Sequence, residues 1–188
     1  MSQPNNPFPS GTQLHSIAET LLSRPAPPLV PRAPWNPDIA AAIEQAAAAE
    51  KASVFVTAAL HLLNDDLDRA HRLVQAREGD QTADYLHMLV HRREGDWSNT
   101  GYWVRRAGEH PVYETLLATI RTYPASYDLV SRRNRWDPNA MVELCRQADE
   151  GKPDTETATA IAQLSIQEIA AALNWCVRRT DSGTTSAT

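Results

Sequence analysis

The feature that most constrains this chain is a nearly uninterrupted series of helical signals between Asn36 and Arg178. Apolar residues recur there at the three- and four-residue spacing of an amphipathic helix, whereas the strict alternation of a half-buried strand occurs nowhere. The spacing predicts seven or eight helices, at 37–50, 52–63, 67–77, 81–93, 97–107, 111–122, 138–149 and 156–178. We therefore expect an all-α protein without a β-sheet.

Residues that cap helices support several of these boundaries. Asn36 can accept hydrogen bonds from the first turn of a helix that starts at Pro37, and Asp137 stands before a proline in the same way. Asp80 precedes the predicted helix at 81–93, and Gly151 follows the one at 138–149.

The two ends of the chain differ in composition from the middle. Eight of the 13 prolines lie between Pro4 and Pro34, interrupted by a short helix-like stretch at Leu14–Leu22. We expect residues 1–35 to form a Pro-rich flexible arm, residues 36–180 a single helical domain and residues 181–188 a disordered tail. Removal of the arm and the tail should then cost little stability, because little apolar area is lost with them.

Two segments of the chain repeat thirty residues apart. Residues 60–70 align with residues 90–100, and each segment is predicted to be a helix, a tight acidic turn and a second helix. This pattern resembles the helical hairpins of tetratricopeptide-type repeats. Because two copies are too few for a solenoid, we expect a compact bundle of helical hairpins that is tetratricopeptide-like in places.

Composition and missing motifs exclude several classes of function. A net charge of −5 makes nucleic acid an unlikely partner, although Arg132-Arg133-Asn134-Arg135 forms a short basic cluster that we interpret as a solvated helix end. No apolar run reaches the roughly 20 residues of a membrane span, and no signal-peptide pattern opens the chain, so we expect a cytoplasmic protein. The glycine motifs of nucleotide-phosphate loops and nucleophile elbows are absent.

The predicted helix at 52–63 is apolar on every side, so it should be the central buried helix. His61 lies within it. A histidine in such a place is either a core residue that hydrogen-bonds to a neighbouring carbonyl or carboxylate, or a ligand-binding residue.

The predicted helix at 81–93 carries four polar groups on one stripe, at Asp84, His87, His91 and, if the helix extends that far, Glu94. Histidines four residues apart can bind one metal ion, and a carboxylate a turn away can complete a nitrogen and oxygen site for zinc or iron. The alternative is a polar stripe that faces solvent or a partner. No cofactor is required by the sequence, but a divalent metal at these four residues is one interpretation.

Arginines and aromatic residues are concentrated after this stripe. Arg93 lies on the apolar side of its helix, which indicates either an escape to solvent or a buried ion pair, and Glu168 in the last helix is a plausible partner for it. A pocket for an anionic ligand is the alternative to a structural pair. The candidate ligand-binding residues are His61, His87, His91, Arg92, Arg93, Asn99, Trp103, Arg105, Arg106 and His110.

The same region resembles a family of uncharacterised bacterial and fungal helical proteins. The block that carries the resemblance reads Tyr85-x-His87-x-x-x-His91-Arg92-Arg93-Glu94-Gly95-Asp96, Ser98-Asn99-x-x-Tyr102-Trp103-x-Arg105-Arg106 and Gly108-x-His110-Pro111. This chain departs from the family pattern at Leu86, where Trp is expected, and at Gly101, where Lys is expected. The resemblance implies a functional site in this block but no particular activity.

Two functions remain open at this point. One is an interaction module that binds a protein partner or a second copy of itself, which the hairpins and the absence of catalytic motifs favour. The other is a small-molecule or metal-binding protein, with or without enzymatic activity, whose site is the His, Arg and Trp patch at residues 84–111.

We predict that Leu60→Ala lowers the free energy of unfolding by about 2–5 kcal/mol, because truncation in a central helix leaves a cavity. Denaturant unfolding of the two proteins measures the difference. A cost below about 1 kcal/mol would place this helix on the surface.

Overall fold

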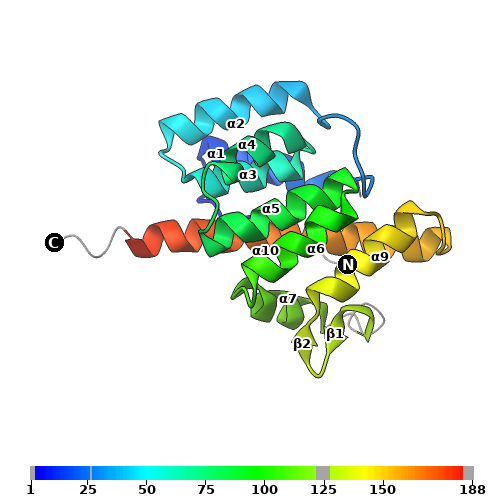
Figure 1. The fold of residues 1–188 in the computed structure, drawn as a ribbon. Helices are drawn as coiled ribbons and strands as arrows, with labels where there is room; N and C mark the ends of the chain where they lie inside the picture. The colour runs from blue at the N-terminus through cyan, green and yellow to red at the C-terminus, as the bar shows by residue number, and fades with distance from the viewer. Residues whose placement is uncertain (1–2, 26, 122–127, 184–188) are drawn as a thin grey trace.

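The computed structural model describes residues 3–25, 27–121 and 128–183, and within these ranges its regular structure is helical apart from one pair of two-residue strands (Figure 1). The helices are α1 (Gln13–Ser23), α2 (Pro37–Ala49), α3 (Val54–Leu63), α4 (Leu67–Gln75), α5 (Gln81–Glu94), α6 (Trp97–Ala107), α7 (Val112–Ile120), α9 (Pro138–Asp149) and α10 (Thr155–Gly183). The predicted all-α class is confirmed. None of the helices in the described ranges has both the length and the apolar character needed to cross a bilayer.

The predicted starts of three helices agree with the structure, because each start is fixed by a capping residue directly before the helix. Asn36 accepts hydrogen bonds from the backbone of Asp38 and Ile39, and Asp80 and Asp137 cap α5 and α9 in the same manner. Gly151 takes a left-handed φ of 71° just after α9. The largest difference in length is at α10, which continues to Gly183 rather than residue 178.

The two repeated segments fold into hairpins with the same turn. In the α3–α4 turn and in the α5–α6 turn, the residues at matching positions have a positive φ, 59° at Asp65 and 76° at Gly95. The aspartate that follows donates its backbone N–H to a histidine carbonyl, over 2.9 Å from Asp66 to His61 and 3.0 Å from Asp96 to His91. Asp66 and Asp96 then cap α4 and α6. The two segments that are similar in sequence therefore also share the same backbone conformation in their turns.

Helix α5 occupies the middle of the molecule. It contacts α3, α4, α6 and α10, and Figure 1 shows α10 crossing behind α5 and α6. Figure 1 places α1–α4 above α5, α7 and the two short strands below it, and α9 to the right, beside α6 and α10. The predicted central helix, α3, is buried from Val56 to Leu63, but α5 is buried over a longer stretch, from Thr82 to Arg93.

The prediction of a flexible N-terminal arm is wrong for α1. Its residues Leu14, Ala18, Leu21 and Leu22 follow the four- and three-residue spacing of a buried helical face, and all four are buried. The carboxylate of Glu50, after α2, accepts hydrogen bonds from the first turn of α1. The prolines that predicted a flexible arm lie in the segments on either side of this helix, and the helix-like stretch between them packs on the core.

The prolines after α1 belong to a strap, residues 27–36, that connects α1 to α2 along the surface of the α3–α4 turn. Asn64 in that turn accepts a hydrogen bond from the Trp35 backbone and exchanges two more with Asn36. The strap is thus an ordered element of the fold.

Two further expectations at the C-terminal half need correction. The basic cluster at 132–135 is not a helix end: Ser131–Arg132 (β1) and Arg135–Trp136 (β2) pair as a minimal antiparallel hairpin. Arg133 and Asn134 between them both have positive φ, as a tight primed turn requires. The predicted tail begins inside α10, which continues to Gly183, and residues 184–188 lie outside the described residues.

We predict that Leu21→Ala lowers the free energy of unfolding by about 2–5 kcal/mol, because the side chain is fully buried in the core. Leu129→Ala is the matched control, since that leucine is 43% exposed and should cost less than about 1 kcal/mol. If denaturant unfolding shows equally small losses of unfolding free energy for both variants, α1 does not contribute to the core.

Candidate functional site

The polar stripe of α5 does not face open solvent. Asp84, His87 and His91 are buried, because α4 and α6 pack on either side of this face. This contradicts the interpretation of the stripe as a solvated or partner-facing surface. The stripe instead forms the inner wall of a polar site between three helices.

His87 and His91 meet a third histidine, His71 of α4. The Nε2 atoms of His71 and His87 lie 2.8 Å apart. The ring of His91 lies 4.9 Å from that of His71 and stacks on that of His87 at 4.8 Å between centroids. One nitrogen from each histidine can be chosen so that all three atoms lie within 4.8 Å of one another.

Glu94 and Trp103 complete this histidine cluster. The Glu94 carboxylate bridges two rings, with one oxygen 2.9 Å from His91 Nδ1 and the other 3.5 Å from His71 Nδ1. The Trp103 indole from α6 lies on His87, with ring centroids 3.8 Å apart and planes inclined by 23°. The indole therefore covers one face of His87 and restricts its rotation.

The protonation states of the cluster suit ligand binding. Burial, followed by the charges of His71 and His91, lowers the pKa of His87 to about 4, so this imidazole is neutral at pH 7 and carries one nitrogen lone pair. A hydrogen bond from His91 lowers the pKa of Glu94 despite partial burial. At neutral pH the site thus offers a neutral imidazole and an ionised carboxylate.

Three imidazoles and a carboxylate are a ligand set that first-row transition ions accept. With metal–nitrogen bonds of about 2.0–2.1 Å, two nitrogens on one ion lie roughly 2.9–3.4 Å apart. The Nε2 atoms of His71 and His87, 2.8 Å apart, lie just below this range, and the third ring needs to approach by about an ångström or two. Glu94 contacts the Nδ1 atom of His71, whereas Nε2 of the same ring faces His87, so the carboxylate has to rotate to share an ion with the three rings. The cluster is therefore a candidate metal centre that closes by side-chain rotation.

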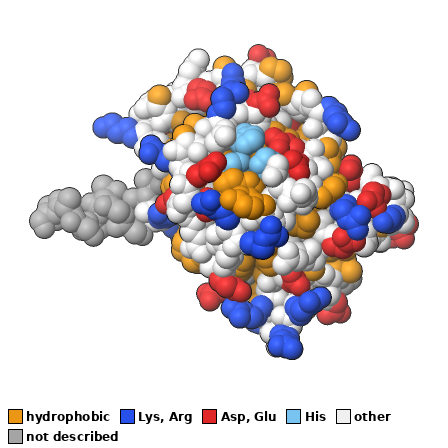
Figure 2. Space-filling view, viewed as in Figure 1, with side chains coloured by type: hydrophobic (Ala, Val, Ile, Leu, Met, Phe, Trp, Pro, Cys, Tyr) orange, Lys and Arg blue, Asp and Glu red, His pale blue; other side chains and the backbone are white. Residues whose placement is uncertain are grey.

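The cluster reaches the surface on one side. The side chains of His71 and Glu94 are 30% and 29% exposed, whereas His87 lies deeper. Figure 2 shows histidine atoms at the surface, surrounded by apolar, acidic and basic side chains. A small molecule could therefore approach this side of the site from solvent.

His71 is the site residue that sequence reasoning missed. On α4 it shares a stripe with Leu67, Ala70 and Val74, at the spacing of a buried helical face, and its neighbours on the stripe pack into the core. A histidine on an apolar stripe beside a predicted pair of histidines was the available signal. The pairing of α4 with α5, which brings the two elements together, could not be derived from that spacing.

Asp84, a predicted metal ligand, does not join the cluster. Its carboxylate accepts a hydrogen bond from the Gly79 backbone at 3.0 Å and another from Arg106 Nε at 3.3 Å. Asp84 therefore fixes Arg106 of α6 beside the histidines, one turn before His87.

The predicted ion pair of Arg93 with Glu168 is wrong in its partner. Glu168 pairs with Arg92, at 2.5 Å, and also accepts a hydrogen bond from Tyr85. Arg93 pairs with Asp65 in the α3–α4 turn, and Asp65 in turn binds Arg24 after α1. Burial lowers the pKa of Arg93 to about 10 although Asp65 favours its charge, so it remains a cation at pH 7.

The remaining candidates lie outside the histidine cluster. His61 is fully buried between Glu44, at 2.8 Å, and Asp66, at 3.5 Å, in agreement with a core histidine. His110 stacks on Tyr85 and accepts a hydrogen bond from the Val112 backbone. Asn99 binds the capping carboxylate of Asp96, and Arg105 is exposed.

Comparison of the chain with protein-family models, with curated proteins and with solved structures found no match. The resemblance of the block at residues 85–111 to a family of uncharacterised proteins therefore stays a prediction. The geometry of the site carries the functional argument by itself.

We predict that the metal-free protein loses stability as pH falls from about 6.5 to about 4. His87 has its ordinary pKa of 6.5 in the unfolded chain but about 4 when folded, so the unfolded chain binds the proton first. The loss attributable to His87 should be on the order of 1–3 kcal/mol across this window.

The difference in unfolding free energy between wild type and His87→Gln, measured from pH 4 to pH 7, isolates this effect. His15→Gln on α1 is the control and should follow the wild-type curve. Parallel curves for wild type and His87→Gln would show that the buried ring does not titrate as described.

Proposed function

We propose that the protein is a metalloprotein that binds one divalent first-row transition ion, zinc or iron, through His71, His87, His91 and Glu94. The observation that carries this proposal is the convergence of three imidazole nitrogens within 4.8 Å of one another. The ionised Glu94 lies against two of the three rings. Nitrogen and carboxylate donors in this combination match the preferences of these ions.

The scaffold around the donors supports the proposal. His87 and His91 stand on the most deeply buried helix, and His71 stands on the helix packed beside it. Trp103 restricts His87 by stacking, and surrounding contacts of this kind orient metal ligands in known sites. Donors on rigid helices lose little conformational freedom when an ion binds.

Because one side of the cluster is accessible to solvent, an ion bound there could also bind a small molecule. Four protein donors leave coordination positions free on an ion that takes five or six ligands, and the exposed edges of His71 and Glu94 mark the side from which a small molecule arrives. We propose the ion as the centre at which a small-molecule ligand is held, and we leave open whether the ligand is transformed there.

Binding of a protein partner or of a second copy is the second candidate, and it has weaker support. The turn geometry shared by α3–α4 and α5–α6 is the observation in its favour, because repeated helical hairpins often form binding surfaces. Against it, the polar stripe expected to meet a partner is buried between helices. Within the described ranges, the exposed large apolar side chains are Trp35, Tyr102 and Leu129, which come from three separate segments.

The cytoplasm remains the proposed location. Cys145 and Cys176 are both buried cysteines, and buried thiols of this kind are expected in a reducing compartment.

Calorimetric titration of the metal-free chain with Zn²⁺ and Co²⁺, together with native mass spectrometry, tests the metal centre. We expect one ion per chain and a rise in melting temperature that grows with ion concentration. His87→Gln and His91→Gln should each weaken binding by roughly 100-fold or more, since loss of even an outer contact costs about 10–100-fold.

The matched control is His15→Gln, which removes a histidine of α1 and should leave ion binding unchanged. His71→Gln is the most informative variant, because it tests the donor from the neighbouring helix. The proposal fails if the wild type binds no ion, or if the cluster variants bind as tightly as the control.

A further inference from the structure

Charged and aromatic side chains follow one another in a fixed order along the face of α5 that carries the histidine cluster. From its start toward its end it presents Asp84 with Arg106, then His87 with Trp103, then His91 with His71, and finally Glu94. Ten residues of helix separate Asp84 from Glu94, or about 15 Å. The proposed ion would thus have a fixed arginine on one side and its carboxylate ligand on the other.

Arg106 is held in place by three neighbours. Its Nε donates to the buried carboxylate of Asp84, and its Nη1 donates to the Tyr102 hydroxyl at 3.3 Å. Its guanidinium lies over the Trp103 ring, 5.1 Å from the centroid, and that ring stacks on His87. The orientation of this cation is therefore set before any ligand arrives.

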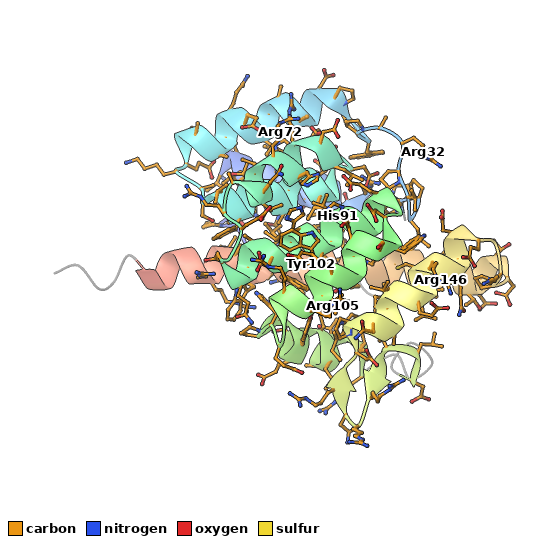
Figure 3. All side chains as sticks on the ribbon, in the orientation of Figure 1. Arg32, Arg72, His91, Tyr102, Arg105 and Arg146 are labelled. Atoms are coloured by element: carbon orange, nitrogen blue, oxygen red, sulfur yellow. The ribbon has the colours of Figure 1, made fainter. Side chains whose placement is uncertain are left out.

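One side of the Arg106 guanidinium remains free to bind. Its side chain is 35% exposed, and within the described ranges its Nη2 donates to no protein acceptor. Arg106 is also close enough to the histidine cluster for its charge to act on His87. Figure 3 shows this face, with His91 on α5 and Tyr102 and Arg105 on α6 labelled.

We propose that the metal centre and Arg106 together bind a small oxyanion, either a carboxylate or a phosphate group of a small molecule. One oxygen would take a free position on the ion, and another would accept from Arg106. This inference rests on the proposed metal centre and names the chemical class of its ligand.

Charge favours an anion at this position. A divalent ion together with Glu94, Arg106 and its partner Asp84 leaves one net positive charge on this face, and the side of Arg106 away from Asp84 presents its donors to a ligand. An oxyanion satisfies both at once, because a carboxylate or a phosphate offers several oxygens to a planar guanidinium. A cationic ligand would face repulsion from the ion and from the arginine.

Phosphate and acetate titrations of the Co²⁺-loaded full-length protein test the inference. The visible absorption of bound Co²⁺ changes when an anion enters its coordination sphere, so the spectrum reports binding at the ion. We expect both anions to bind the wild type, and Arg106→Gln to weaken the tighter of them at least about tenfold. The tighter anion identifies a phosphate or a carboxylate as the group that the site prefers.

Arg105→Gln is the matched control, because Arg105 is the residue before Arg106 on α6, is exposed and has the same charge. It should stay within about twofold of the wild type. Arg106→Lys keeps the charge opposite Asp84 and protects the fold, and it should bind the anion with intermediate affinity. Circular dichroism and Co²⁺ affinity confirm that each variant is folded and metal-loaded.

The outcomes separate this inference from the proposal on which it rests. If the wild type binds no Co²⁺, the metal centre and the anion site both fall. If Co²⁺ binds but the anions do not alter its spectrum, or if Arg106→Gln and Arg105→Gln weaken binding equally, only the anion site falls. In the last case the attraction is a general effect of surface charge.

Discussion

Two adjacent buried arginines of α5 hold the rest of the molecule to that helix. Neighbouring helical residues point about 100° apart, so Arg92 and Arg93 leave α5 in different directions. Arg92 reaches Glu168 of α10, and Arg93 reaches Asp65 in the α3–α4 turn. Loss of one partner from a buried pair costs about 3–5 kcal/mol, because the remaining charge has no solvent around it. The position of α5 is therefore tied to both halves of the chain.

The histidine cluster depends on this arrangement. The Arg93–Asp65 pair fixes the turn from which α4 starts, and α4 then brings His71 to the stripe of α5. On the other side, the α5–α6 turn brings Trp103 and Arg106 to the same stripe. The site is thus assembled from two hairpins whose relative position is set by charges at some distance from it.

Local signals in the sequence were sufficient for most of the secondary structure and insufficient for partner choice. Asn36, Asp80 and Asp137 cap their helices through backbone groups two or three residues away, so these boundaries could be predicted. Whether Arg92 or Arg93 meets Glu168 depends on how α5 is rotated against α10, which no local pattern encodes. The same holds for His71. Its spacing along α4 predicts that it lies on a buried helical face, but it does not predict that this face packs against α5. Proline content alone does not distinguish a flexible arm from an ordered one, whereas the spacing from Leu14 to Leu22 is that of a packed helix.

The two related turns differ at the one position where a left-handed backbone is needed. Gly95 takes it without strain, whereas Asp65 takes it with a side chain, at a cost of roughly 1–2 kcal/mol that its two arginine contacts offset. An additional hairpin copied from α5–α6 would have a glycine in place of the Asp65 carboxylate. An additional hairpin copied from α3–α4 would bury a carboxylate without arginines such as Arg24 and Arg93 to pair with it. The hairpin is therefore not a unit that can be repeated to build a longer array. Each of the two copies has a turn residue that suits its own position, so the structure accommodates two copies and no more.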